Sequence, residues 1–146
     1  MSMVDIGKKP TIYREATAEG IIRLKSETLK FIREGKVEKG DVFESAKVAG
    51  ILAAKKTSEL IPLCHPLPLS NVNVNVEANH KSAVAVKATV KAHAKTGVEM
   101  EALVAVSTAL LTVWDMTKQY EKDKDGQYPT TAINNIRVLY KVKRSE

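Results

Sequence analysis

The chain has 146 residues, of which 44% are hydrophobic, so it is long enough for one well-cored domain and too short for two ordinary ones. Its 23 Lys and Arg against 17 Asp and Glu give a net charge of +6, which suits an anionic partner such as a phosphorylated small molecule. The charge density falls short of a nucleic-acid-binding tail, and aromatic residues make up only 5% of the chain, which argues against a nucleic-acid partner. We expect a single domain over residues 1–146, with residues 1–10 flexible.

The single cysteine excludes an internal disulfide, and the chain shows neither a basic-then-apolar leader nor a long apolar run. We therefore expect a cytoplasmic protein that makes no membrane contact. Cys64 and three scattered histidines lack the spacing of zinc ligands, so no metal site is predicted. Consecutive residues of an extended segment point to opposite faces, so Cys64 and His65 are poorly placed to pair as thiolate and imidazole.

The first half of the chain predicts one strand and two helices. Apolar residues among polar ones suggest a strand over residues 11–24. Ser26 is expected to cap a short helix that ends at Gly35, and Asp41 to cap a second helix that runs to about Thr57. The small residues of the second helix would permit close packing.

Residues 60–69 put the only cysteine and one of three histidines into an apolar segment with three prolines. A buried histidine needs a polar partner, and proline fixes φ and removes a backbone donor, so this segment can be the floor of a site at which His65 is aimed. The alternative is an apolar edge strand in which His65 simply bonds to a backbone carbonyl. The segment by itself favours the alternative.

The second half predicts a hairpin, a long helix and a last strand. Strict alternation begins at Ser70, pauses at a turn over residues 79–82, and resumes over residues 84–93 with valine and alanine on one face. The outward lysines of the hairpin are best explained as a solvated face. Gly97 opens a helix that runs to about Lys122, and residues 133–142 suggest the final strand.

This order of elements is the split βαβ arrangement of an α+β sandwich. It predicts a ferredoxin-like fold, with an antiparallel four-stranded sheet and helices on one face. The open sheet face and a narrow alanine stripe on the long helix (Ala102, Ala105 and Ala109) both suggest self-association.

Two pairs of charged residues on the long helix are candidates for chemistry. Glu99 and Glu101 lie at its start, where the helix dipole stabilises negative charge, but they point about 200° apart and do not form an acid/base dyad. Asp115 and Lys118 are three residues apart and can meet on the helix surface. Such a pair is usually solvent-facing, yet beside Trp114 it could be partly buried and could act as a coupled proton donor and acceptor.

A third candidate is Lys39, which precedes Gly40 and Asp41 at a predicted helix start, where backbone N–H groups can hold a phosphate. The signal is weak, and the chain has no glycine-rich nucleotide-binding motif. Glu101 and Asp115 are separated by fourteen residues, which places them roughly 21 Å apart along a straight helix. If both act on one small substrate, a second chain must complete the site, and a short distance within one chain would overturn this prediction.

Four motifs occur here in an order typical of one family: KGDVF at residues 39–43, LIPLCHPL at 60–67, GVEMEAL at 97–103 and DMTK at 115–118. From MVD at residues 3–5 to RVLYK at 137–141, the chain resembles cyclic pyranopterin monophosphate synthase, the molybdenum cofactor biosynthesis protein C family. The combination of motifs is specific. It reverses the preference for an edge strand over residues 60–69, so this segment is now expected to be the floor of a site.

The resemblance implies a lyase that converts a GTP-derived substrate, (8S)-3',8-cyclo-7,8-dihydroguanosine 5'-triphosphate, to cyclic pyranopterin monophosphate and releases pyrophosphate. It implies a homohexamer built as a trimer of dimers, with the site at a subunit interface and no metal or organic cofactor. A radical-SAM GTP cyclase would supply the substrate, with a transient contact between the two proteins.

Residue by residue, the resemblance implies that Asp115, Lys118 and Lys39 are catalytic. The substrate-binding positions that it implies are Leu63, Cys64, His65, Glu99, Met100 and Glu101, with Arg14 and Lys141 for the triphosphate. Thr117 stands where relatives often have cysteine, and the tail over residues 141–146 is short, so neither a thiol role nor tail contacts with phosphate carry over. The alternative function is a non-catalytic ferredoxin-like oligomer that binds nucleotides or other anionic metabolites.

Overall fold

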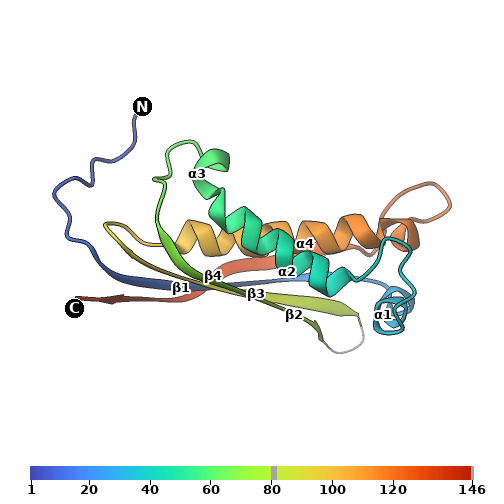
Figure 1. Ribbon diagram of the computed structural model, residues 1–146. Helices are drawn as coiled ribbons and strands as arrows, with labels where there is room; N and C mark the ends of the chain where they lie inside the picture. Colours follow the sequence, from blue (N-terminus) through green and yellow to red (C-terminus); the bar gives the residue numbers. More distant parts are fainter. Residues whose placement is uncertain (80–81, 146) are drawn as a thin grey trace.

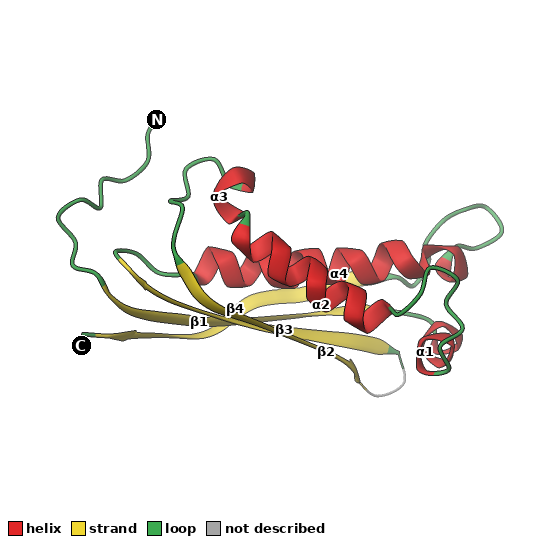
Figure 2. Cartoon of the chain, in the orientation of Figure 1, coloured by secondary structure: helices red, strands yellow, loops and turns green. Residues whose placement is uncertain are grey.

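The computed structural model describes residues 1–79 and 82–145 and arranges them in two layers, a sheet and the helices on one of its faces (Figure 2). The strands are β1 (Ile12–Arg23), β2 (Leu69–Asn79), β3 (Ala83–Ala94) and β4 (Ala132–Arg144), in the order β2-β3-β1-β4 with antiparallel neighbours. The helices are α1 (Ser26–Arg33), α2 (Val42–Lys55), α3 (Thr57–Leu60) and α4 (Glu99–Glu121). This confirms the predicted ferredoxin-like α+β fold. The predicted turn at 79–82 includes His80 and Lys81, which lie outside the described residues, as does Glu146.

The alternating pattern of the two central strands directs their small apolar residues toward the helices. Ala16 and Ala18 of β1 pair with Val90 and Ala88 of β3, and all four are fully buried. The intervening residues, such as Lys87, face away from the helices, as alternation in a strand requires. The predicted hairpin and its inward face are confirmed.

Helices α2 and α4 cross the sheet side by side and approach each other closely (Figure 1). A Cβ added at Gly50 of α2 would lie 3.0 Å from the carbonyl oxygen of Ala105 of α4, so the backbones themselves are near contact. The alanine stripe on α4 is completely buried by this packing within one chain. The stripe therefore explains close packing within one chain, and self-association stays a prediction to which the stripe gives no support.

Helix α4 forms one continuous segment of 23 residues. By length and composition alone it is long and apolar enough to cross a membrane, yet 50% of its most apolar window is buried inside this fold. Core helices share that composition, and the packing of α4 against the sheet and α2 accounts for its apolar character.

Local features differ from the predictions at two places. Helix α1 begins at Ser26 rather than after it, and no side chain of its own caps it. Residues 60–69 do not form an edge strand, because α3 ends at Leu60, a turn follows, and β2 begins only at Leu69. The predicted cap of α2 is confirmed, since Asp41 Oδ1 accepts a hydrogen bond from the Glu44 N–H at 3.1 Å.

The buried carboxylate of Glu121 takes over the capping of α1. It is 0% exposed and accepts hydrogen bonds from the backbone N–H of Lys25 at 3.0 Å, from the hydroxyl of Thr28, and from the hydroxyl of Thr131 at 2.7 Å. One side chain at the end of α4 thus fixes the start of α1 and the segment that leads into β4.

We predict that Glu121→Ala lowers the free energy of unfolding by about 3 kcal/mol, because two buried hydroxyls and a backbone N–H lose a charged acceptor. Denaturant titration followed by circular dichroism measures this loss. Glu27→Ala, at an exposed position of α1, is the control and should change stability by about 0.5 kcal/mol or less. Equal effects of the two substitutions would contradict a clamping role.

Candidate active site

A cluster of three charged side chains, the Lys-Asp-Lys cluster (Lys39, Asp115 and Lys118), forms near the C-terminal end of α4. Lys39 reaches across from the loop between α1 and α2, and its Nζ lies 3.0 Å from Asp115 Oδ2 and 3.0 Å from the Asp115 backbone oxygen. Lys118 Nζ lies 2.9 Å from the other carboxylate oxygen, Oδ1. One carboxylate is therefore held between two ammonium groups, and the cluster carries a net positive charge.

The electrostatics of the cluster follow from these contacts. Hydrogen bonds from Lys118 and then Lys39 lower the pKa of Asp115 below its usual value. The hydrogen bond and charge of Asp115 raise the pKa of Lys118 in turn. At neutral pH the cluster thus presents an ionised acceptor next to a charged donor.

The cluster is largely exposed in a single chain. The Asp115 side chain is 58% exposed and those of Lys39 and Lys118 are each 43% exposed, so in one chain the pair has the usual solvent-facing arrangement and Asp115 is not buried beside Trp114. The reason is helical direction, because Met116 and Thr117 face the core and Asp115 consequently faces solvent.

The other end of α4 holds a buried carboxylic acid. Glu101 is 2% exposed, its Oε2 lies 4.0 Å from Cys64 Sγ, and its Oε1 has no hydrogen-bond partner within residues 1–79 and 82–145. Glu99 turns away, with its Oε1 3.3 Å from Lys141 Nζ. The predicted divergence of the two glutamates is confirmed.

Burial controls the protonation of this end. Desolvation raises the pKa of Glu101, and the nearby charge of Glu99 raises it further. Burial, followed by the charge of Glu101, raises the pKa of the Cys64 thiol. A thiol with a raised pKa is a poor nucleophile near neutral pH, in agreement with the sequence-based argument against cysteine hydrolase chemistry.

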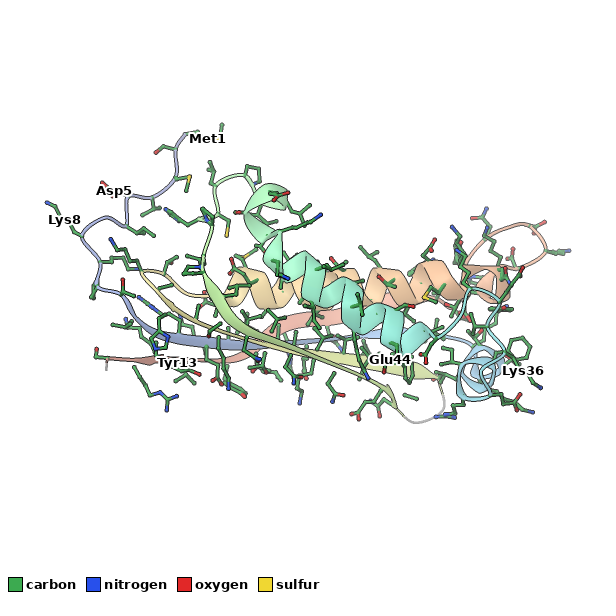
Figure 3. All side chains as sticks on the ribbon, viewed as in Figure 1. Met1, Asp5, Lys8, Tyr13, Lys36 and Glu44 are labelled. Atoms are coloured by element: carbon green, nitrogen blue, oxygen red, sulfur yellow. The ribbon has the colours of Figure 1, made fainter. Side chains whose placement is uncertain are left out.

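His65 lies in the loop before β2 and bonds to the N-terminal segment. Its Nε2 donates to the backbone oxygen of Val4 at 2.8 Å, and Lys95 Nζ donates to the Gly7 oxygen at 3.2 Å. His65 thus has the backbone carbonyl partner of the alternative interpretation, although the segment is not an edge strand, and its role in substrate binding stays a prediction. Residues 1–10, on which Figure 3 labels Met1, Asp5 and Lys8, contain neither helix nor strand but lie against this end of the molecule.

The remaining predicted residues lie around the Glu101 end. Leu63 and Met100 are 45% and 37% exposed, so two apolar side chains border this end at the surface. Arg14 is only 8% exposed, and its terminal nitrogen donates to the Lys95 oxygen at 3.3 Å. Lys141, in contrast, is 65% exposed and reaches Glu99 from β4.

The structure sorts the predicted residues into two groups at opposite ends of α4. Figure 1 shows α3 and the N-terminal segment near one end of α4 and α1 at the other. Because α4 is continuous, the separation of fourteen positions from Glu101 to Asp115 corresponds to roughly 21 Å. Within one chain, therefore, the two groups do not share a small substrate.

One hollow of the described surface includes no residue of either group. A hollow of about 590 Å³ opens on the uncovered sheet face and is lined by Glu19, Lys87 and Arg137, away from both ends of α4. In the part of the chain that the structure describes, no three His, Cys, Asp or Glu side chains are grouped so as to hold a metal ion.

Two residues next to the Lys-Asp-Lys cluster carried no signal in the sequence. The hydroxyl of Tyr120 accepts a hydrogen bond from the Glu38 N–H at 2.9 Å, and Glu121 caps α1 as described above. Both contacts join residues more than 80 positions apart. Only the folded structure shows them, because local sequence patterns report on neighbours within a few residues.

The fold is that of a ferredoxin-like α+β protein, and comparison with known proteins shows the family to which the chain belongs. A family model described as the MoaC family matches residues 3–143. The chain belongs to the MoaC family.

Three relatives illustrate this membership. The chain is 57% identical over 144 residues to a protein of Saccharolobus solfataricus and 54% identical over 143 residues to one of Pyrococcus abyssi, each named "Probable cyclic pyranopterin monophosphate synthase". These alignments cover 99% and 98% of this chain and 96% and 89% of the relatives. A Methanothermobacter thermautotrophicus relative, 56% identical over 97% of this chain and 88% of its own length, is named an accessory protein of that synthase. Because the first two relatives are named synthases, the prediction of an enzyme is confirmed.

We predict that Glu101→Gln stabilises the protein increasingly as pH rises. An acid with a raised pKa in the folded state loses stability as pH climbs from its unfolded pKa through its folded pKa, and glutamine does not titrate. Denaturant titrations at several pH values measure the difference from wild type. Glu77→Gln, on the open sheet face, is the control and should differ by about 0.5 kcal/mol or less at each pH. If Glu101→Gln changes the free energy of unfolding by the same amount at every pH, the raised pKa of Glu101 is contradicted.

Proposed function

We propose that this chain is a synthase of molybdenum cofactor biosynthesis. In this proposal it converts (8S)-3',8-cyclo-7,8-dihydroguanosine 5'-triphosphate to cyclic pyranopterin monophosphate with release of pyrophosphate. The observation that carries the proposal is the Lys-Asp-Lys cluster, a carboxylate between two ammonium groups in a chain of the MoaC family.

The proposed reaction needs what the cluster offers. Rebuilding a purine-derived ring takes several proton transfers, for which an ionised Asp115 beside a protonated Lys118 is suited as acceptor and donor. Closing a cyclic phosphate builds up negative charge on oxygen, which Lys39 and Lys118 can stabilise. Lys141 and Arg14 are proposed to hold the triphosphate from the other end of α4.

We further propose that the complete site joins two copies of the chain in a hexamer built as a trimer of dimers. The Lys-Asp-Lys cluster of one copy would meet Cys64, His65 and Glu101 of another. The roughly 21 Å along α4 supports this arrangement, since one small substrate cannot span it within one chain. The half-exposed cluster and the exposed Leu63 and Met100 are surfaces that a second copy would cover.

The substrate is labile in this proposal, so we also propose a transient contact with the radical-SAM GTP cyclase that makes it, in the cytoplasm. No metal or organic cofactor is required by the proposed proton transfers and phosphate closure.

We predict that Asp115→Asn and Lys118→Ala each reduce product formation by about 100-fold or more, because a general acid or base is lost. Product is measured by chromatography and mass spectrometry with the cyclised triphosphate as substrate, and binding of an unreactive analogue by calorimetry. Asp125→Asn, in an exposed turn, is the matched control and should retain activity. A wild-type protein that binds the analogue without forming product would instead support the non-catalytic alternative, a reading that the accessory-protein name of one relative favours.

Mixing inactive variants tests the shared site. When Asp115→Asn and Glu101→Gln chains are unfolded, mixed in equal amounts and reassembled, random pairing should restore about a quarter of the wild-type sites. Each variant treated alone is the control and should remain inactive. Mass measurement verifies that mixed assemblies have formed. If these assemblies form no more product than the two controls, a site built from two chains is contradicted.

A further inference from the structure

We propose that Tyr120 is a positioning residue that holds the loop between α1 and α2 so that Lys39 meets Asp115. The inference deepens the proposed function, because it assigns a role at the same Lys-Asp-Lys cluster to a residue that does not itself belong to the cluster.

The loop is attached to α4 at the residue before Lys39. The backbone N–H of Glu38 donates to the Tyr120 hydroxyl at 2.9 Å, and Gln119 Nε2 donates to Glu38 Oε2 at 3.1 Å. Since Glu38 immediately precedes Lys39, these bonds determine where the Lys39 side chain starts.

The attachment adds to two other contacts of the loop, a turn in which the Gly40 N–H donates to the Val37 oxygen at 3.1 Å and the burial of the Val37 side chain. Gly35 and Gly40 flank Lys39 with positive φ angles of 68° and 115°, and open space surrounds both glycines. The Lys39 side chain is 43% exposed, and an exposed ion pair of a long flexible side chain contributes little stability of its own. The contact of Lys39 with Asp115 therefore depends on the position of its backbone.

Tyr120 is a firm attachment point. Its ring packs edge-on against Phe31 of α1, with centroids 5.2 Å apart, and it borders the hydrophobic core. Its neighbour Glu121 clamps the start of α1. Asp115 lies on the same helix, five residues earlier, so α4 fixes both the carboxylate and the attachment of the loop that carries Lys39.

The competing explanation is that Val37, which is 7% exposed, anchors the loop by burial and that the Tyr120 hydroxyl merely satisfies a surface N–H. The two explanations differ in what removal of the hydroxyl does to Asp115.

The test is Tyr120→Phe, which keeps the ring and removes the hydroxyl. The readout is the pKa of Asp115, followed by carbon-13 NMR of labelled aspartate and assigned with Asp115→Asn. We expect this pKa to rise toward its ordinary value, because Lys39 is no longer held while Lys118 remains. We also expect kcat to fall about five-fold with little change in KM, as for loss of one neutral hydrogen bond.

Tyr140→Phe is the matched control, since Tyr140 is 53% exposed and stands on β4. It should leave both readouts unchanged. A double-mutant cycle with Lys39→Ala then separates positioning from general structure: if Tyr120 acts through Lys39, Tyr120→Phe should have no further effect on the Asp115 pKa once Lys39 is alanine.

An unchanged Asp115 pKa in Tyr120→Phe, or a full additional shift in the Lys39→Ala background, would overturn the inference. The pKa readout does not depend on turnover. A wild-type protein without synthase activity would therefore refute the proposed function and still leave the role of Tyr120 to be decided by NMR.

Discussion

The continuous helix α4 is the constraint on which the rest of this structure depends. Its alanine stripe packs against α2 and its larger apolar residues against the sheet, so it cannot bend or shift without opening the core. It also carries a carboxyl group near each end, Glu101 and Asp115, and therefore sets their separation. The rigid core is thus what makes the two ends distinct sites within one chain and what motivates the proposal of a second copy.

The two ends offer opposite protonation chemistry with the same type of side chain. Near the C-terminal end, two lysines keep Asp115 ionised in an exposed position. Near the N-terminal end, burial favours the neutral form of Glu101 and of its neighbour Cys64. Environments that shift the pKa values of two carboxyl groups in opposite directions are a general way to divide acid and base roles within one enzyme. If the two ends meet between subunits, the assembled site would contain both.

Sequence patterns predicted the sheet, the long helix and the Asp115–Lys118 pair because each depends on residues close together in the chain. Alternation placed Val84 to Val90 inward, and a spacing of three residues placed Lys118 beside Asp115. The contacts of Lys39 with Asp115 and of Glu38 with Tyr120 join distant segments, and they depend on how α1 docks on α4. The sequence left open whether Asp115 faces solvent or is partly buried beside Trp114, because tertiary packing decides which side of a helix faces the core.

The central claim is that the two ends of α4 act together on one substrate, across two chains. A structure of the assembled protein with an unreactive analogue of the cyclised triphosphate tests it most directly. We predict that the analogue contacts Asp115 and Lys118 of one copy and His65 and Glu101 of another. An analogue bound entirely within one chain, or bound away from both ends of α4, would contradict the account.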